Sequence, residues 1–334
     1  MRGLPGLAEL LERAVPVELP LRARFRGIVS RETLLLRGPQ GWAEFAPFAE
    51  YEVQETAHWL RAAIAQGWQE PVPVLRESVA VNATVPAVEP ARVPEILARF
   101  PGCNTVKIKV AQAGESLADD IARVKAVREA MGEKAILRVD ANGGWSVAAA
   151  GKAAAALQAY NLDYIEQPCA TAPELAALRR TLSKQGINIK IAADESVRRA
   201  TDPLAVARAG AADLLVIKAA PLGGVTRARQ IIEQAGLPVI ISSALETSVG
   251  ISAGVRLAAS LPDNLLYGAC GLGTVSLFAA DITENPLLPQ SGLLPVRAVT
   301  PAPALLAAHE IKGRAKDIWL DRLRAAHAVL SSKK

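Results

Sequence analysis

Short apolar runs recur along the middle of the chain, and each of them ends in a charged or hydroxyl side chain. The runs end at the following residues: Lys109, Asp140, Glu166, Asp194, Lys218 and Ser242. Successive ends are therefore 31, 26, 28, 24 and 24 residues apart. A strand together with the helix that leads to the next parallel strand takes roughly 30 residues. The spacing predicts a parallel βα repeat in which a polar residue always closes the strand at its carboxyl end.

The strand–helix alternation begins near Ser78 and continues to about residue 270. Eight strands are expected, with seven helices between them, near residues 79–83, 104–109, 135–140, 162–166, 187–193, 213–217, 238–242 and 265–268. The predicted fold class is α/β, a modified TIM barrel of the (β/α)7β kind. In such barrels the active site is built at the carboxyl ends of the strands.

The segments on either side of the repeat have a different pattern. Residues 19–48 alternate with period two and contain a Gly-Pro-Gln-Gly turn, which predicts antiparallel strands, and residues 51–66 form an amphipathic helical pattern. We expect an α+β domain over residues 1–76, the barrel over 77–290, and a tail over 291–334 that packs back on both. A last helix is expected near residues 318–330.

Composition excludes several classes of protein. No apolar run reaches the 18 residues of a membrane helix, and the net charge of +5 is scattered without a basic stripe, so neither a membrane nor a nucleic acid is an expected partner. The three cysteines are far apart and fit reduced thiols better than a disulfide framework or a zinc site. The first residues lack a signal-peptide layout, so a cytoplasmic location is expected. The net positive charge of the chain is also compatible with a small anionic substrate.

Successive side chains of a strand point to opposite faces, and this alternation is expected to place the polar residues on the same side of the sheet. Val106 and Ile108 lie on one face of their strand and Lys107 and Lys109 on the other, so both lysines are expected to point into the barrel. The same parity puts Arg138 on the inward face of the next strand. A structural ion-pair network is the alternative interpretation, but buried networks are a poor route to stability. The whole set therefore favours a functional site.

Three carboxylates at neighbouring strand ends predict a hard divalent cation. Asp140, Glu166 and Asp194 supply oxygen ligands of the kind that Mg2+ prefers, with Mn2+ as the alternative, and no thiolate or imidazole lies near them in sequence. Such a cation can hold a substrate carboxylate while a lysine removes the proton on the adjacent carbon and the metal stabilises the enediolate. The lysine needs a lowered pKa, which the metal and a neighbouring ammonium group would provide.

The set of motifs resembles the enolase superfamily over nearly the whole chain. The matching pieces, in order, are Lys107-Ile108-Lys109, Asp140-Ala141-Asn142, Glu166-Gln167-Pro168, Asp194-Glu195-Ser196 and Lys218. The superfamily is a standard example of a Lys or His base paired with Mg2+. The resemblance implies that the N-terminal α+β segment is a capping domain, completed by the C-terminal tail.

Lysines on two strands are similar to the muconate-lactonising subgroup, which includes muconate cycloisomerases, dipeptide epimerases, N-acylamino acid racemases and o-succinylbenzoate synthases. The resemblance implies that Asp140, Glu166 and Asp194 bind Mg2+, that Lys109 is the acid/base and that Lys218 opposes it. All three histidines lie outside the strand region, which removes the branch with a barrel histidine as base. The residues expected to contact substrate are Lys107, Arg138, Asn142, Ser242 and Ser243.

Within the subgroup, the segment after the seventh strand, Ser242 to Ser248, resembles that of the o-succinylbenzoate synthases, and the last strand has no acidic residue to hold a substrate amine. This resemblance implies a lyase of menaquinone biosynthesis. The implied reaction is the Mg2+-dependent syn-dehydration of 2-succinyl-6-hydroxy-2,4-cyclohexadiene-1-carboxylate to 2-succinylbenzoate.

Other activities stay open at this point. An N-acylamino acid racemase, a muconate cycloisomerase or a dipeptide epimerase would use the same lysines. A Schiff-base lyase would use Lys218 without needing three carboxylates, and a non-catalytic binding protein would need neither. The expected partner is a small-molecule carboxylate, and the sequence leaves the oligomeric state open between a monomer and a small homo-oligomer.

Overall fold

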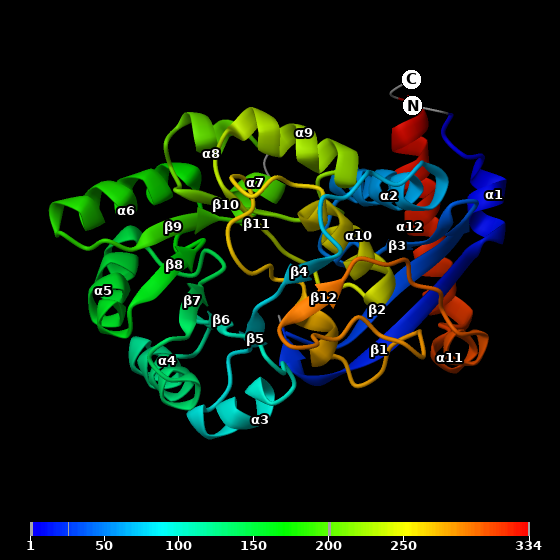
Figure 1. The fold of residues 1–334 in the computed structure, drawn as a ribbon. Helices are drawn as coiled ribbons and strands as arrows, with labels where there is room; N and C mark the ends of the chain where they lie inside the picture. Colours follow the sequence, from blue (N-terminus) through cyan, green and yellow to red (C-terminus); the bar gives the residue numbers. More distant parts are fainter. Residues whose placement is uncertain (1–2, 26, 200–201, 333–334) are drawn as a thin grey trace.

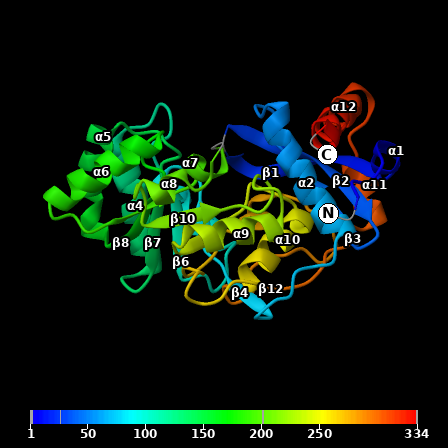
Figure 2. The same ribbon diagram turned by 90° about the horizontal axis from the view of Figure 1, so that it is seen from above.

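The computed structural model describes residues 3–25, 27–199 and 202–332, and these form two parts that lie side by side (Figure 1). One part combines the N-terminal strands with the C-terminal helix α12 (Gly313–Ser332), which lies beside the first helix α1 (Leu7–Glu12). The other part consists of the alternating strands and helices of the middle of the chain. The same division is clear from above (Figure 2).

The first part is the predicted α+β domain. Its antiparallel sheet has the order β1-β2-β3, with Ala14 paired to Leu36 at one end and Gly38 to Gly41 at the other. Helix α2 packs on β3, and α12 packs on α2. The elements are α1 (Leu7–Glu12), β1 (Ala14–Phe25), β2 (Ile28–Gly38), β3 (Gly41–Phe45), α2 (Val53–Trp68), α11 (Pro303–His309) and α12 (Gly313–Ser332). The boundaries at residues 76 and 290 stay predictions.

The second part is a barrel whose seven named strands are all parallel and follow one another in chain order. These strands are β5 (Ala83–Val85), β6 (Thr105–Lys109), β7 (Ile136–Asp140), β8 (Leu162–Glu166), β9 (Lys190–Ala193), β10 (Leu214–Ile217) and β11 (Val239–Ile241). The predicted eighth strand is present as isolated parallel bridges: Leu266 and Gly271 join the β11 side, and Cys270 joins Val81. These bridges link the two edges of the sheet, and the predicted (β/α)7β architecture is confirmed.

Helices cover the outside of the barrel. They are α3 (Val93–Leu97), α4 (Leu117–Met131), α5 (Val147–Leu157), α6 (Ala172–Lys184), α7 (Glu195–Arg198), α8 (Ala205–Arg208), α9 (Val225–Ala235) and α10 (Ser248–Ala259), with short 3₁₀ turns at Pro90–Arg92, Gln158–Tyr160 and Gly273–Leu277. Ser116 is the N-cap of α4 and forms a capping box with Asp119. Within the described parts of the chain, no helix is long and apolar enough to cross a lipid bilayer.

The first predicted strand, residues 79–83, is wrong in detail. The chain here forms two short strands, β4 (Ser78–Ala80) and β5. Strand β4 pairs in antiparallel fashion with β12 (Leu293–Pro295) of the C-terminal segment, and only β5 enters the barrel beside β6. Alternation in the sequence marks an extended segment, but it does not say which distant strand will satisfy the backbone groups.

Apolar side chains fill the barrel below its charged end. Tyr164, Ala192, Leu214, Val216 and Ile240 form a separate buried cluster inside the sheet. The residues two positions further along these strands, or just past them, are polar: Glu166, Asp194, Lys218 and Ser242. Because side chains alternate along a strand, both sets face the same side. The charged residues therefore rest on an apolar floor and are held at the carboxyl ends of the strands.

Glu44 of β3 joins the two parts. Its buried carboxylate accepts hydrogen bonds from the Thr247 amide at 3.1 Å, the Thr247 hydroxyl at 2.6 Å and the Gly250 amide at 2.8 Å. These donors lie at the start of α10, where the first amides of a helix have no partners within the helix. Burial raises the pKa of Glu44 to about 7, against the lowering effect of these hydrogen bonds.

Two glycine substitutions should change stability in opposite directions. A Cβ on Gly38 would overlap the carbonyl group of Gly67 in α2, so Gly38→Ala should destabilise the protein by about 3 kcal/mol. Gly151 lies inside α5, and a Cβ there meets only a methyl group at 3.9 Å. Gly151→Ala should therefore stabilise by about 0.5–1 kcal/mol. Urea unfolding followed by circular dichroism checks both, and equal effects would contradict the close approach of Gly38 and Gly67.

Glu44→Ala should cost about 3 kcal/mol, because it leaves buried amide and hydroxyl donors at the start of α10 without an acceptor. The matched control is Glu18→Ala on β1, where an exposed carboxylate bonds Ser30, and it should change stability by less than about 0.5 kcal/mol. Urea unfolding measures both variants. A Glu44 variant as stable as the parent would mean that another group satisfies these donors.

Candidate active site

Register across the sheet places the predicted residues in rows. Lys107 is paired with Arg138 of β7, which is paired with Tyr164 of β8; two residues further on, Lys109, Asp140 and Glu166 form the next row. Asp194 follows β9 directly, and Lys218 follows β10. Neighbouring strands are about 4.8 Å apart. The sheet therefore brings the predicted catalytic and metal-binding residues to one end of the barrel.

Ammonium groups lie between the carboxylates. The Nζ atom of Lys107 is 3.0 and 3.1 Å from the two Glu166 oxygens and 3.2 Å from Asp140 Oδ2. Lys109 Nζ donates to the same Asp140 oxygen at 2.5 Å and to Asn142 Oδ1 at 2.7 Å. On the other side, Lys218 Nζ donates to Asp194 Oδ2 at 2.5 Å.

The electrostatics differ among the three carboxylates. Burial alone would raise the pKa of Asp140, but Lys109 and Lys107 hold it well below its usual value. Burial is likewise overcome at Asp194, where Lys218 and Arg198 lower the pKa. At Glu166, burial and then the nearby Asp140 charge raise the pKa to about 7. An added cation beside these carboxylates would act in the same direction as the lysines and lower the pKa of Glu166.

The donor set fits a divalent cation in its chemistry. Asp140, Glu166 and Asp194 are three oxygen donors on adjacent strand ends, and each has at most 1% of its surface exposed. Within the described residues, no three His, Cys, Asp or Glu side chains are arranged around a common metal position. The lysines hold the carboxylate oxygens in this arrangement, so metal binding requires ammonium groups to withdraw. The metal-ligand roles stay predictions.

Strained backbone supports these strand ends. Gln167 follows Glu166 with a positive φ of 37°, a conformation that costs a residue with a Cβ of order 1–3 kcal/mol. Its side chain is fully buried and compensates: the amide oxygen accepts from Asp194 N at 2.9 Å and from Ser196 N at 3.2 Å, and its nitrogen donates to the Ser196 hydroxyl at 2.7 Å. Gln167 therefore fixes the end of β9 relative to that of β8.

A small cavity of about 390 Å³ opens between the lysines. Lys107, Lys109, Asp140 and Lys218 line it from the barrel. Further lining comes from Phe25 at the end of β1 in the N-terminal domain and from a set of small or apolar residues: Thr84, Ser242, Ser243, Ala244, Leu245, Gly271 and Thr274. Lys109 Nζ is 5.6 Å from the centre of the Phe25 ring. A small substrate placed here would meet both predicted catalytic lysines.

The predicted substrate contacts fall into two groups. Ser242 and Ser243 line the cavity, and Ser243 shares a 2.8 Å hydrogen bond with Thr274, which the sequence did not indicate. Asn142 contacts Lys109 and Glu195 instead. Their substrate-binding roles stay predictions.

Lys107 and Arg138 are held by the protein itself. Lys107 is buried against Glu166, and burial is outweighed by Glu166 and Asp140, which raise its pKa. Arg138 donates to Asp163 at 2.9 Å and to the Ala269 carbonyl at 2.6 Å, and it lines neither this cavity nor the larger one below. These contacts favour the structural ion pair that was the alternative interpretation, and the substrate-binding roles of Lys107 and Arg138 stay predictions.

One contact that the sequence did not indicate reaches the site from the other domain. Arg198 of α7 donates its Nε to Asp194 at 3.1 Å and its Nη2 to Glu195 at 2.6 Å, and its Nη1 bonds the hydroxyl of Tyr51. Tyr51 precedes α2. Asp194 is therefore held between Lys218 on one side and an arginine tied to the N-terminal domain on the other.

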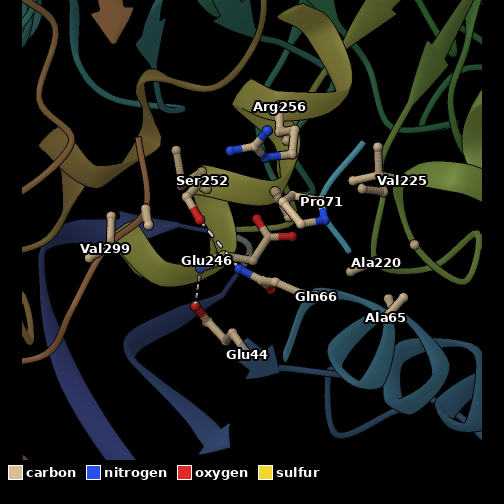
Figure 3. A pocket seen from close by; sticks show the side chains of 18 of the residues that line it. Glu44, Ala65, Gln66, Pro71, Ala220, Val225, Glu246, Ser252, Arg256 and Val299 are labelled. Carbon is tan, nitrogen blue, oxygen red and sulfur yellow. Dashed lines mark hydrogen bonds between the residues drawn. The ribbon is translucent and has the colours of Figure 1, made fainter. Parts of the chain in front are cut away.

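A larger cavity of about 1270 Å³ lies between the two parts (Figure 3). Glu44 of β3, Gln66 of α2 and Arg256 of α10 border it, and Val299 comes from the C-terminal segment. Gln66 bridges to Val249 and Ser252 of α10 at 2.8 and 3.3 Å. Ser242 and Ser243 line both cavities, so the larger space adjoins the candidate site.

Comparison with known proteins agrees with this architecture. Residues 95–301 match the enolase C-terminal domain-like family, and residues 16–67 match the enolase N-terminal domain-like family. Among solved structures, the muconate lactonizing enzyme from Pseudomonas fluorescens has a TM-score of 0.75 at 20% identity, covering 90% of this chain and 98% of that one. The L-Ala-D/L-Glu epimerase from Bacillus subtilis has a TM-score of 0.71 at 21% identity, covering 86% and 98%. These likenesses show the fold.

Relatives that match this chain over nearly their whole length identify its family more narrowly. A protein of Mycolicibacterium smegmatis named o-succinylbenzoate synthase is 52% identical over 98% of this chain and 99% of its own length. Proteins of the same name from Mycobacterium leprae and Mycobacterium tuberculosis are also 52% identical over 98% of this chain, covering 95% and 97% of their own lengths. The chain therefore belongs to the o-succinylbenzoate synthase family of the enolase superfamily.

Proposed function

We propose that this chain is a lyase that converts 2-succinyl-6-hydroxy-2,4-cyclohexadiene-1-carboxylate to 2-succinylbenzoate by syn-dehydration, in menaquinone biosynthesis. The observation that carries the proposal is the 52% identity to o-succinylbenzoate synthases over 98% of the chain. Lys109, Lys218 and Asp140 line one cavity, and Glu166 and Asp194 are buried at the neighbouring strand ends, so the groups that such a reaction needs lie close together.

Lys109 is proposed as the base and then the acid. It reaches the cavity from β6, and Asp140 and Asn142 fix its Nζ atom. In its neutral form the amine takes the proton from the carbon that carries the ring carboxylate. The resulting ammonium group then gives a proton to the departing hydroxyl group on the same face. One C–H and one C–O bond break, a ring double bond forms, and water leaves.

Lys218 is proposed to stay charged throughout. It enters the cavity from β10, and its contact with Asp194 favours the ammonium form. An ammonium group over the ring face would stabilise the negative charge that develops when the proton is removed. Loss of water makes the ring aromatic, so the second step is downhill, and proton removal is the step that the site must assist.

Asp140, Glu166 and Asp194 are proposed to hold Mg2+, with Mn2+ as the alternative. A bound divalent cation supplies a Lewis acid for the ring carboxylate and makes the adjacent carbon more acidic. Lys107 keeps Glu166 and Asp140 together, and Gln167 and Arg198 fix Asp194. Removal of such a supporting contact typically lowers metal affinity or activity by about 10–100-fold.

Lys109→Ala should lower kcat by about 10²–10⁴-fold, because it removes the general base. The measurement is the ultraviolet absorbance of the aromatic product formed from the cyclohexadiene acid, with and without EDTA. Lys125→Ala on the exposed face of α4 is the control and should keep parental activity. Activity that survives in Lys109→Ala, or in the parent after EDTA treatment, would contradict the mechanism.

Arg198→Gln should raise the Mg2+ concentration needed for half-maximal activity by about 10-fold, because Asp194 loses a charged contact. Tyr51→Phe should cause a smaller shift in the same direction, since it removes only the hydroxyl that holds Arg198. Arg199→Gln is the control, because Arg199 pairs with Glu55 at 3.5 Å and not with Asp194. Activity titrated against Mg2+ checks all three, and unchanged titration in Arg198→Gln would reject the positioning role.

A further inference from the structure

Two arginines from different parts of the molecule meet without an acidic partner. Arg61 lies on α2, and Arg227 lies in the first turn of α9. A Cβ built on Gly223 would be 3.4 Å from Cδ of Arg61 and 3.2 Å from Cδ of Arg227, so both side chains cross the same glycine. Within the described residues, neither arginine makes an ion pair, and the Nε atom of Arg61 is buried without a hydrogen-bond acceptor.

This pairing is unfavourable as it stands. Burial, followed by the charge of Arg227, lowers the pKa of Arg61. Guanidinium groups stay protonated at neutral pH, so the two cations repel each other. Three other arginines of α7 and α9 and the residue after α7 have carboxylate partners: Arg198 has Asp194, Arg199 has Glu55 and Arg229 has Glu233. The Arg61–Arg227 pair therefore lacks an anion that its neighbours have.

The backbone between the arginines is also suited to an anion. Gly223 and Gly224 have positive φ angles of 89° and 106°, and Gly224 starts the 11-residue helix α9 with no side chain capping it. The first amides of a helix point outward with a partial positive charge. Gly224, Val225 and Thr226 line the larger cavity, as does Ala65 of α2 (Figure 3), so the start of the helix is open on this side, and Arg61 and Arg227 lie outside the lining.

We propose that Arg61, Arg227 and the start of α9 form a binding site for a phosphate-type oxyanion, either free or as the terminal group of a phosphorylated small molecule. Two guanidinium groups match the charge and the fork geometry of a phosphate dianion. A bound anion would be attracted to both guanidinium groups, and these two attractions would outweigh the repulsion between the arginines. Because Arg61 belongs to α2 and Arg227 to α9, the anion clamps the N-terminal domain to the barrel. The clamp lies on the turn that follows Lys218.

Isothermal titration of the metal-free protein with inorganic phosphate tests the site, and glycerol 3-phosphate in a second arm distinguishes a phosphate monoester from the free ion. Phosphate should bind the parent and bind Arg61→Gln and Arg227→Gln at least about tenfold more weakly, since each loses one charged contact. Arg229→Gln, on the same helix but paired with Glu233, should bind like the parent.

Lys109→Ala separates this site from the lysines of the barrel, because it should keep parental phosphate affinity. Melting temperatures give a second readout: sodium chloride should stabilise the parent more than Arg61→Gln, because salt screens a repulsion that the variant lacks. No phosphate binding by the parent, or equal affinity in the parent and in both arginine variants, would overturn the proposal. The two arginines would then have only a packing role against the turn at Gly223.

Discussion

The candidate site depends on the mutual neutralisation of charges that are buried at the ends of adjacent strands. Asp140, Glu166 and Asp194 are almost completely inaccessible to water, and each has a lysine within 3.2 Å. Removing one member of a buried ion pair typically costs about 3–5 kcal/mol, because the other charge stays buried and unpaired. The lysines therefore contribute to the stability of the fold as well as to the proposed chemistry. The same contacts occupy carboxylate oxygens that the proposed metal would need.

Much of this could be predicted from the sequence, because the decisive patterns are local. A repeat of 24 to 31 residues and a side-chain period of two are enough to put Lys109, Asp140, Glu166 and Lys218 at one end of a barrel and facing inward. The alternation of side chains does not, however, say how far from the carboxyl end of the strand an inward-facing residue lies. Arg138 shares the inward face with Asp140 but lies two residues, about 6.6 Å, further from the carboxyl end. At that depth it meets Asp163 and the Ala269 carbonyl.

Contacts between distant segments could not be predicted in this way. Glu44 and Thr247 are 203 residues apart, and nothing in either segment indicates that one caps the helix of the other. The strained Gln167 likewise depends on Asp194 and Ser196, which follow β9 and are 27 and 29 residues later in the chain. The split of the first strand into β4 and β5 follows from pairing with β12 near the other end of the chain. In each case the deciding partner is supplied by the tertiary structure.

Three long-range contacts lie between the N-terminal domain and the barrel, and each one acts on a residue or turn that follows a strand of the candidate site. Tyr51 holds Arg198 and through it Asp194, Glu44 holds the start of α10 just after Ser242 and Ser243, and Arg61 meets Arg227 just after Lys218. The first two are attractive as they stand, whereas the third is a repulsion between two cations. A shift of the N-terminal domain would therefore move the supports of three neighbouring barrel strands together. An anion bound at the third contact would make the interaction between α2 and α9 attractive, and it would therefore favour the position of the domain seen here over any other.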